Sequence, residues 1–304
     1  MLSETLPDVI AIRLANSGLS QRLETKIFGL LSGQLASTAH SSQSVAVSAA
    51  NYHLQAGGSR VRGQCALHAG LMLGLSESDA ICVAAAAELL HNASLIHDDL
   101  QDSDDTRRGL PAVWKKFGPN VAICAGDLML SAAYASLGGL RDSRQVPALL
   151  TLVHARTALA IQGQCEDLGA SKNTPINLGE YIKVVTAKSG ELLSLSLELP
   201  FVASGKQNWV AQARDAAEAF AVAYQIADDL ADVLLDKESG SLNIICILES
   251  GEPGMNALAS ARLLGNQYLD KAIALSRELP FDSGATLGKL SFKLRPNFAG
   301  GNDR

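Results

Sequence analysis

The sequence predicts an all-α protein. Ala and Leu dominate the chain, alternation of β-branched residues is rare, and apolar residues recur at helical spacing through most of the 304 positions. Hydrophobic residues make up 47% of the chain, which is enough for a sizeable core. The breaks between helical segments are short and rich in Gly and Pro, and none resembles a long linker. We therefore expect one domain over residues 1–304.

Five segments carry the helical pattern most clearly. They are residues 77–102, 120–137, 147–168, 176–199 and 211–235. The segment 77–102 is apolar on opposite sides, with Ala80, Val83 and Ala87 on one and Cys82 and Leu89 on the other. A helix that is apolar all round is central and buried.

Charge and cysteine usage exclude several classes of protein. Lys and Arg number 25 against 31 Asp and Glu, so the basic excess typical of a nucleic-acid binder is absent from the sequence. The five cysteines are scattered without CxxC spacing, which argues against a disulfide framework or a zinc site and favours a reduced, cytoplasmic setting. We see neither an apolar run of signal-peptide type nor a segment approaching about 18 uncharged apolar residues, and expect no transmembrane segment.

The first informative cluster is His97-Asp98-Asp99-Leu100-Gln101-Asp102, at the end of an apolar helix. Asp98 and Asp102 are four positions apart and share a helix face, whereas Asp99 points about 100° away. Two carboxylates on one face repel each other unless a cation neutralises them. Oxygen ligands at this spacing suit a hard cation such as Mg²⁺.

The second cluster, Gln225-Ile226-Ala227-Asp228-Asp229-Leu230-Ala231-Asp232, repeats this geometry. A single DDxxD is most often a solvated helix end. Two copies, each near the end of an apolar helix, make that explanation poor.

Arg107-Arg108-Gly109 follows the first cluster closely, and the planar fork of Arg suits phosphate. Metal ions and Arg together would stabilise a leaving diphosphate, while an apolar cavity would keep water from an allylic cation.

These segments belong to a longer ordered series of motifs. The series is Gly57-Gly58-x-Arg60-x-Arg62, Glu88-Leu-Leu-His91, Leu95 to Asp102, Arg107-Arg108-Gly109, Ala125-Gly126-Asp127, Gly163-Gln164-x-x-Asp167-Leu168, Lys188-Ser189-Gly190 and Gln225 to Asp232. In this order, the chain resembles the trans-isoprenyl diphosphate synthases, or polyprenyl synthetases. The resemblance covers about residues 57–236, and the C-terminal region is divergent.

The resemblance implies a fold, substrates and an assembly. The fold is a single-domain isoprenoid-synthase helical bundle around a deep central cavity. The reaction joins an allylic diphosphate to isopentenyl diphosphate in a homodimeric enzyme, with about three Mg²⁺ ions present when substrate is bound. The leaving pyrophosphate is the candidate base that removes the final proton.

The resemblance also implies roles for individual residues. The metal-binding set is Asp98, Asp102 and Asp228, supported by Asp99, Asp167, Asp229 and Asp232. Contacts with the allylic diphosphate fall to Arg107 and Lys188, and contacts with isopentenyl diphosphate to Arg62, His91 and Arg108. The residues expected near the reacting carbons are Gln164, Ser189 and Gln225.

Two departures from the family pattern affect substrate binding. Ser59 stands where the family usually has Lys, so affinity for isopentenyl diphosphate is expected to be weaker, with Arg60 as a possible substitute. The family's second lysine cannot be placed, and Lys237 is a candidate.

Ala93 and Ser94 are small where bulky residues would form the floor that stops chain growth. The floor is expected deeper, near Leu90, which favours a product of about C20 or longer over C15.

Other readings stay open. A class I terpene cyclase usually pairs one aspartate motif with an Asn/Ser/Glu motif, whereas both motifs here are aspartate-rich. A non-catalytic or atypical subunit of a heteromeric synthase commonly loses these aspartates, which this chain keeps. A condensing enzyme with an unusual acceptor would also be compatible with Ser59. A helical scaffold without chemistry is the least favoured reading.

Overall fold

The computed structural model describes residues 18–33, 44–169, 177–239, 242–251 and 256–299, without the side chains of Asp167 and Ser239. The chain forms two compact units. Unit 1 comprises Met1–Leu152 and Leu199–Gln207, and unit 2 comprises Val153–Glu198 and Asn208–Arg304. Helices α8 and α10 each contribute residues to both units. One domain around a deep central cavity stays a prediction.

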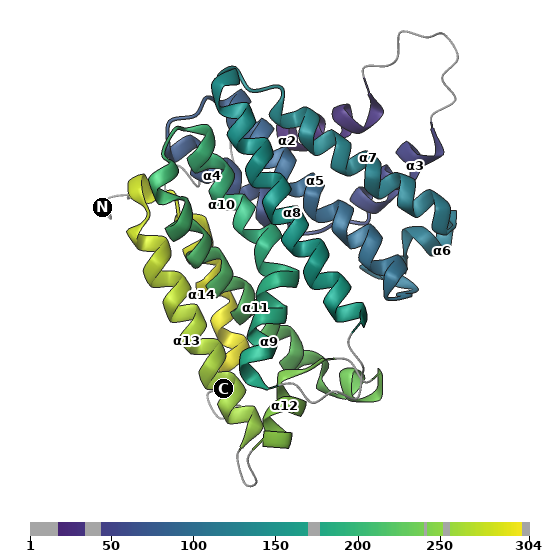
Figure 1. Cartoon of the computed structure of the whole chain (residues 1–304), viewed down its shortest axis with the longest axis vertical. Helices are drawn as coiled ribbons and strands as arrows, with labels where there is room; N and C mark the ends of the chain where they lie inside the picture. The colour runs from purple at the N-terminus through teal and green to yellow at the C-terminus, as the bar shows by residue number, and fades with distance from the viewer. Residues whose placement is uncertain (1–17, 34–43, 170–176, 240–241, 252–255, 300–304) are drawn as a thin grey trace. The chain divides into compact units, whose positions relative to one another are not determined.

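The described elements are helical apart from one hairpin, which confirms the all-α class (Figure 1). The elements of the N-terminal half are α2 (Leu19–Ser32), α3 (Val45–Gln55), α4 (Val61–Met72), α5 (Glu77–Gln101), β1 (Thr106–Arg107), β2 (Leu110–Pro111), α6 (Val113–Phe117), α7 (Pro119–Leu137) and η1 (Ser143–Gln145). Those that follow are α8 (Val146–Gly169), α9 (Leu178–Val185), η2 (Thr186–Gly190), α10 (Glu191–Ala203), η3 (Gln207–Trp209), α11 (Val210–Ser239), α12 (Ile244–Gly251), α13 (Ala257–Glu278), η4 (Pro280–Asp282), α14 (Ala285–Leu294) and η5 (Arg295–Phe298). Four of the five predicted segments each form one helix, and the fifth, 176–199, is divided by the π-helical turn η2.

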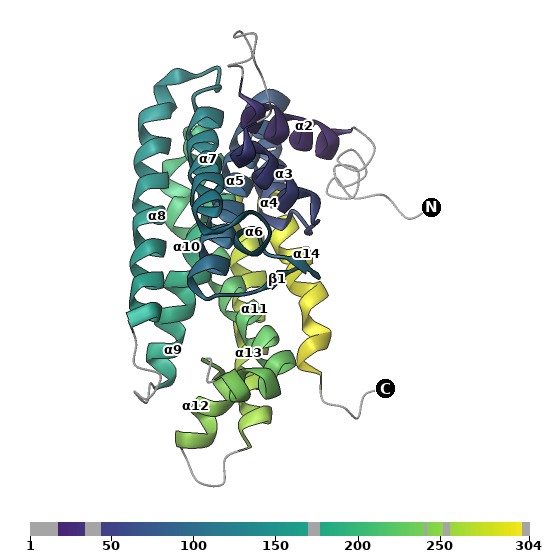
Figure 2. The same cartoon turned by 90° about the vertical axis from the view of Figure 1, so that its right-hand side faces the viewer.

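Helix α5 is the core of unit 1. It begins after Ser76, whose hydroxyl accepts a hydrogen bond from the Asp79 amide at 3.2 Å and so caps the helix. The side chains of Val83–Ala87 are fully buried, and α5 packs against α4 and α7 (Figure 2). The prediction of a central, buried helix is confirmed.

Two helices, α5 and α7, are long and apolar enough to cross a membrane by length and composition alone. In α5, 78% of the most apolar window is buried inside the protein, against 44% in α7. The core position of α5 accounts for its apolar sequence.

Helix α11 is the long helix of unit 2 and lies beside α13, which in turn packs against α14 (Figure 1). Ala213, Ala217 and Ala221 are buried on α11. Their small side chains let the neighbouring helices approach closely. At the start of α9, Asn177 and Glu180 form a reciprocal capping box with bonds of 3.0 and 2.8 Å.

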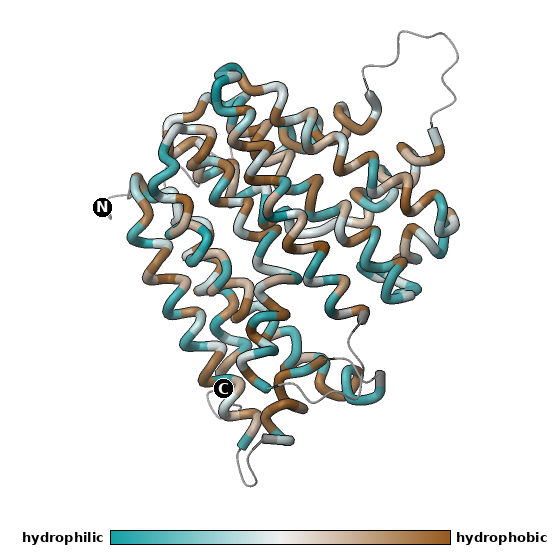
Figure 3. The backbone as a smooth tube through the Cα atoms, viewed as in Figure 1, coloured by the Kyte–Doolittle hydropathy of each residue, from teal (hydrophilic) through white to brown (hydrophobic). Residues whose placement is uncertain are grey.

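Both aspartate motifs lie where an apolar helix becomes polar. Helix α5 is buried as far as Ile96 and leads into the hydrophilic segment around the hairpin (Figure 3). Helix α11 has one buried face that runs through Ala227, whereas Asp228 and Asp232 are exposed. The fold therefore presents each motif at the border between core and solvent of its own unit.

Candidate active site

The first motif divides its carboxylates between the interior and the surface. Asp98 is half-buried and Asp102 is exposed, whereas Asp99 is fully buried. The Asp99 carboxylate accepts hydrogen bonds from Nε of Arg107 at 2.7 Å and from the second guanidinium nitrogen, Nη2. Burial nevertheless raises the pKa of Asp99, because desolvation outweighs the attraction of Arg107. The inward turn of Asp99 agrees with the 100° offset expected from helical geometry.

The arginine pair lies on the hairpin that follows α5. Arg107 pairs with Leu110 in the β1–β2 ladder, and the turn residues Arg108 and Gly109 have φ values of +54° and +75°. Positive φ at both central residues is what a tight two-residue hairpin requires. Arg108 thereby reaches back to the glycine pair: its Nη1 donates to the Gly57 carbonyl, and a Cβ on Gly58 would lie 2.9 Å from its guanidinium carbon.

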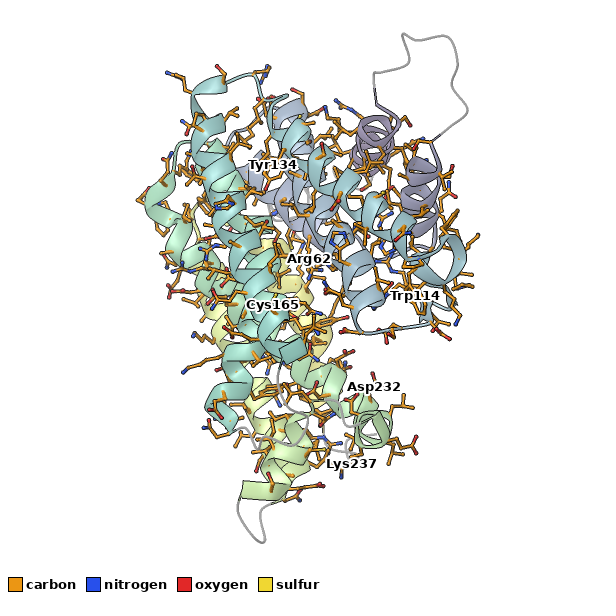
Figure 4. The ribbon with its side chains drawn as sticks, turned by 45° about the vertical axis from the view of Figure 1, so that its right-hand side comes forward. Arg62, Trp114, Tyr134, Cys165, Asp232 and Lys237 are labelled. Carbon is orange, nitrogen blue, oxygen red and sulfur yellow. The ribbon has the colours of Figure 1, made fainter. Side chains whose placement is uncertain are left out.

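Positive charge gathers around His91. Burial lowers the pKa of His91 well below its ordinary value, and Arg62, Arg108, His53 and Arg107 lower it further. The pKa of Arg108 is also lowered, first by burial and then by Arg60 and Arg107. Like charges held this close favour a bound anion, which would neutralise them. This arginine cluster, comprising Arg60, Arg62, Arg107 and Arg108, lies wholly in unit 1, and Figure 4 labels Arg62.

Arg60 is held by its own unit. Its Nε donates to Glu24 at 2.7 Å and its Nη2 to the Leu54 carbonyl at 2.9 Å, while Ser59 is exposed. That Arg60 takes over the role of the family's lysine stays a prediction.

The second motif repeats the division seen in the first. Asp229 is 2% exposed and accepts hydrogen bonds from Tyr181 Oη, Gln225 Nε2 and the Ile244 amide, each at 2.8 Å. The Asp229 carbonyl accepts a further bond from Asn243 at 2.8 Å. Asp229 therefore joins α9, α11 and the start of α12.

Asp228 and Asp232 remain at the surface of α11. The pKa of Asp228 is raised, first by the protein atoms around its carboxylate and then by the neighbouring charges of Asp232, Asp229 and Asp236. A cation bound beside these carboxylates would relieve their repulsion.

The predicted phosphate ligands of unit 2 differ in how they are held. Lys237 is exposed near the end of α11 and bonds both carboxylate oxygens of Glu249, at 2.8 and 3.1 Å (Figure 4). Lys188 and Ser189 lie half-buried on the π-helical turn η2, a feature often found at functional sites. Gly163 fits against this turn because a Cβ there would be 2.8 Å from that of Ala187.

The remaining predicted residues lie on α8 and α5. Gln164 is buried on α8, and the side chain of Asp167 lies outside the described part of the chain. Leu90 and Ala93 are buried in α5. Ser94 is half-buried and donates to the His91 carbonyl at 2.8 Å.

The described residues contain no ready-made group of three or more His, Cys, Asp or Glu side chains placed to hold a metal ion. Mg²⁺ does not require one, since it usually takes one or two carboxylates and completes its shell with water and phosphate oxygens. The pairs Asp98–Asp102 and Asp228–Asp232, each spaced by one helical turn, fit that requirement.

Sequence reasoning missed the partners that hold Asp229. Tyr181 lies 48 positions before it and Asn243 lies 14 positions after it. No local pattern marks either residue as a partner of the motif. The repeated DDxxD spacing was the available signal, because it places the middle aspartate off the shared face.

The fold matches that of solved isoprenoid synthases. The geranylgeranyl pyrophosphate synthetase of the archaeon Geoglobus acetivorans has a TM-score of 0.79 at 26% identity, covering 92% of this chain and 98% of that one. The chain belongs to the polyprenyl synthetase family, whose model matches residues 43–243.

Two curated relatives share the motif-bearing region. The short chain isoprenyl diphosphate synthase of Methanothermobacter thermautotrophicus is 34% identical over 192 residues, covering 63% of this chain and 59% of the relative. The (2E,6E)-farnesyl diphosphate synthase of Mycobacterium bovis is 37% identical over 158 residues, covering 52% and 44%. The chain thus matches less than two thirds of the length of either relative.

Proposed function

We propose that this chain is a magnesium-dependent trans-prenyltransferase. It joins an allylic diphosphate head-to-tail to isopentenyl diphosphate, giving a longer all-trans prenyl diphosphate and pyrophosphate. The observation that carries the proposal is the division within each DDxxD motif. Asp99 and Asp229 turn inward and hold the surrounding segments, whereas Asp98 and Asp102, and likewise Asp228 and Asp232, lie one helical turn apart towards the surface, where cations can reach them.

The proposed role of Mg²⁺ is to neutralise the diphosphate as its bond to the allylic carbon breaks. Arg107 and Lys188 hold the allylic diphosphate, while Arg62, His91 and Arg108 hold isopentenyl diphosphate. The lowered pKa of His91 keeps its ring neutral at neutral pH, so it offers a hydrogen bond without adding to the crowded positive charge. Gln164, Ser189 and Gln225 lie beside the reacting carbons.

One incubation tests this proposal. Purified protein is mixed with Mg²⁺, labelled isopentenyl diphosphate and each allylic diphosphate from C5 to C20, with EDTA in a parallel control. A longer prenyl diphosphate that forms only with Mg²⁺ supports the proposal. A cyclic hydrocarbon would instead indicate a terpene cyclase, and no product with any starter would indicate a non-catalytic subunit.

Product length follows from the residues before the first motif. We propose a floor near Leu90 and a product of about C20 or longer. The relatives described above are named for short-chain, farnesyl and geranylgeranyl products, so the family alone leaves the length open.

Replacing Ser94 with Phe is expected to shorten the main product by one or more isoprene units. Ser94 is half-buried, so a larger ring can be accommodated, whereas Phe at the fully buried Ala93 would also overpack the core. Chromatography of the dephosphorylated products measures the change. Ser94→Ala, which loses only the bond to the His91 carbonyl, is the control. An unchanged product from Ser94→Phe and from Ala93→Phe would place the floor elsewhere.

Replacing Ser59 with Lys is expected to lower the KM for isopentenyl diphosphate by about fivefold, because an added cation at an exposed loop contributes roughly 1 kcal/mol to phosphate binding. The KM for the allylic substrate should not change. Ser59→Gln is the uncharged control. If the KM for isopentenyl diphosphate does not fall, another group already supplies this charge.

A second candidate function is condensation with an acceptor other than isopentenyl diphosphate. It is favoured by the exposed Ser59 and by the commitment of Arg60 to Glu24 and Leu54. Product formation from an allylic diphosphate and a different nucleophile, without incorporation of labelled isopentenyl diphosphate, would distinguish it. We further propose that the protein forms a homodimer and is located in the cytoplasm.

A further inference from the structure

A buried chain of hydrogen bonds connects three helices of unit 1. Nε2 of His53 on α3 lies 3.2 Å from Oδ1 of Asn92 on α5. Nδ2 of Asn92 donates to the carbonyl and to Oε2 of Glu88, at 2.8 and 3.2 Å. Oε1 of Glu88 accepts from the amide of Gly63 on α4 at 2.8 Å. The three side chains are no more than 2% exposed.

The direction of these bonds fixes the position of one proton. Because Nδ2 of Asn92 faces the acceptors of Glu88, its Oδ1 faces His53. Nε2 of His53 must therefore carry the hydrogen. Burial, together with Arg108, Arg107 and Arg60, lowers the pKa of His53 to about 3, so the ring is neutral at physiological pH. His53 acts as a neutral donor and adds no charge to the arginine cluster.

Two members of this chain of bonds are sequence neighbours of predicted phosphate ligands. Asn92 follows His91 directly, and Gly63 follows Arg62. Gly63 has to be a glycine here, because a Cβ would lie 2.7 Å from Cγ of Glu88. This close approach fixes the start of α4 against α5, and with it the backbone that carries Arg62 and His91.

We propose that His53 and Asn92 are positioning residues, which act through Glu88 and Gly63 to hold His91 and Arg62 in the arrangement that binds the second diphosphate. The inference rests on the proposed function, since it takes that diphosphate to be the one on isopentenyl diphosphate. An apolar side chain at position 53 could fill the same volume, but it would remove the bond to Oδ1 of Asn92, and one at position 92 would remove the bond to Oε2 of Glu88. The chain of bonds therefore fixes a geometry that packing alone does not specify.

The test compares two amides that differ by one methylene group. In His53→Gln the side-chain nitrogen reaches the position of Nε2, so the bond to Asn92 is expected to survive. In His53→Asn the nitrogen stays too close to the backbone to reach it. We expect His53→Asn and His53→Leu to raise the KM and the Kd for isopentenyl diphosphate about tenfold, with the KM for the allylic diphosphate within twofold of wild type. His53→Gln should stay within threefold for both substrates.

The control is His68→Leu, which removes a buried histidine of α4 that is not one of the residues in the chain of bonds. Its melting temperature should fall while the ratio of the two KM values stays unchanged. Calorimetry with isopentenyl diphosphate alone, without Mg²⁺ or allylic substrate, supplies the Kd whether or not the protein turns over. Each variant is first checked for helical signal, and if His53→Leu does not fold, the Gln and Asn pair decides.

The outcomes separate the two ideas. A wild-type protein that binds isopentenyl diphosphate but makes no condensation product overturns the proposed function, and the Kd values still judge the positioning role. Equal Kd values for wild type, His53→Gln and His53→Asn overturn the positioning role, as does a parallel rise in both KM values that His68→Leu reproduces. If the wild-type protein does not bind isopentenyl diphosphate, the positioning role of His53 and Asn92 is overturned as well.

Discussion

Asp228→Ala should lower kcat by at least about a thousandfold while the helical signal stays that of the wild type. The carboxylate lies at the surface of α11, and its pKa is raised first by the protein atoms around it and then by the charges of Asp232, Asp229 and Asp236. A cation held there stabilises the developing charge of the leaving diphosphate by several kcal/mol, and about 4 kcal/mol corresponds to a thousandfold in rate. Asp98→Ala should have an effect of the same order.

The matched control is Asp215→Ala, which removes another exposed aspartate from α11, more than three turns before the motif. Its activity should remain within twofold of wild type. Initial rates at saturating substrate across a Mg²⁺ titration give the comparison. Near-normal Mg²⁺-dependent activity in either motif variant would mean that the metal assignment is wrong.

The double variant tests whether both motifs serve one reaction step. Residues that act as a unit have strongly non-additive effects on rate, so Asp98→Ala combined with Asp228→Ala should lose little more activity than either single change. Two independent sites would instead give multiplied losses. Because this comparison uses rates alone, it reports on joint action in solution without any assumption about how the two units are arranged.

The helices were predictable because the sequence repeats their period over long stretches. Helix α5 is apolar on every side, and only a central helix can bury such a surface, so both its limits and its core position follow from the pattern. The apolar pattern also predicted where the buried part of each helix ends and its aspartate motif begins. In each helix the last buried apolar residue precedes the carboxylates: Ile96 precedes Asp98, and Ala227 precedes Asp228.

The bonds that hold the site together could not be predicted, because they join residues far apart in the sequence. The pair Arg60–Glu24 spans 36 positions, and the bond from Tyr181 to Asp229 spans 48. The π-helical turn η2 was also missed, since one wider turn leaves the apolar spacing of the segment 176–199 almost unchanged. Spacing alone placed Asp99 off the shared face, but the structure was needed to identify Arg107 as its partner.

Arg156→Met should produce the largest loss of stability among the variants considered. Arg156 of α8 is 8% exposed and binds two carboxylates of α10: its Nε and Nη2 donate to Glu198 at 2.8 and 2.6 Å, and its Nη1 donates to Glu191 at 3.0 Å. Glu198 is fully buried and also accepts from Ser194 at 3.0 Å. Removing one partner of a buried ion pair leaves uncompensated charge in the interior, at a cost of about 3–5 kcal/mol.

Thermal unfolding measures this loss, and the melting temperature should fall by roughly 6 °C or more. The control is Arg144→Met, which breaks the solvent-exposed pair with Asp142 and should leave the melting temperature unchanged.

Replacing the whole buried cluster separates the need for charge from the need for packing. The triple variant combines Arg156→Met with Glu191→Gln and Glu198→Leu. All three charges of the cluster are then removed together, and none is left without its partner. Its melting temperature should recover most of what Arg156→Met loses, because apolar groups of similar volume often replace a buried ion pair without loss. If the triple variant is no more stable than the single one, the cost lies in lost packing around the long Arg156 stem. If both are as stable as wild type, the three charges contribute nothing to the folded state of unit 2.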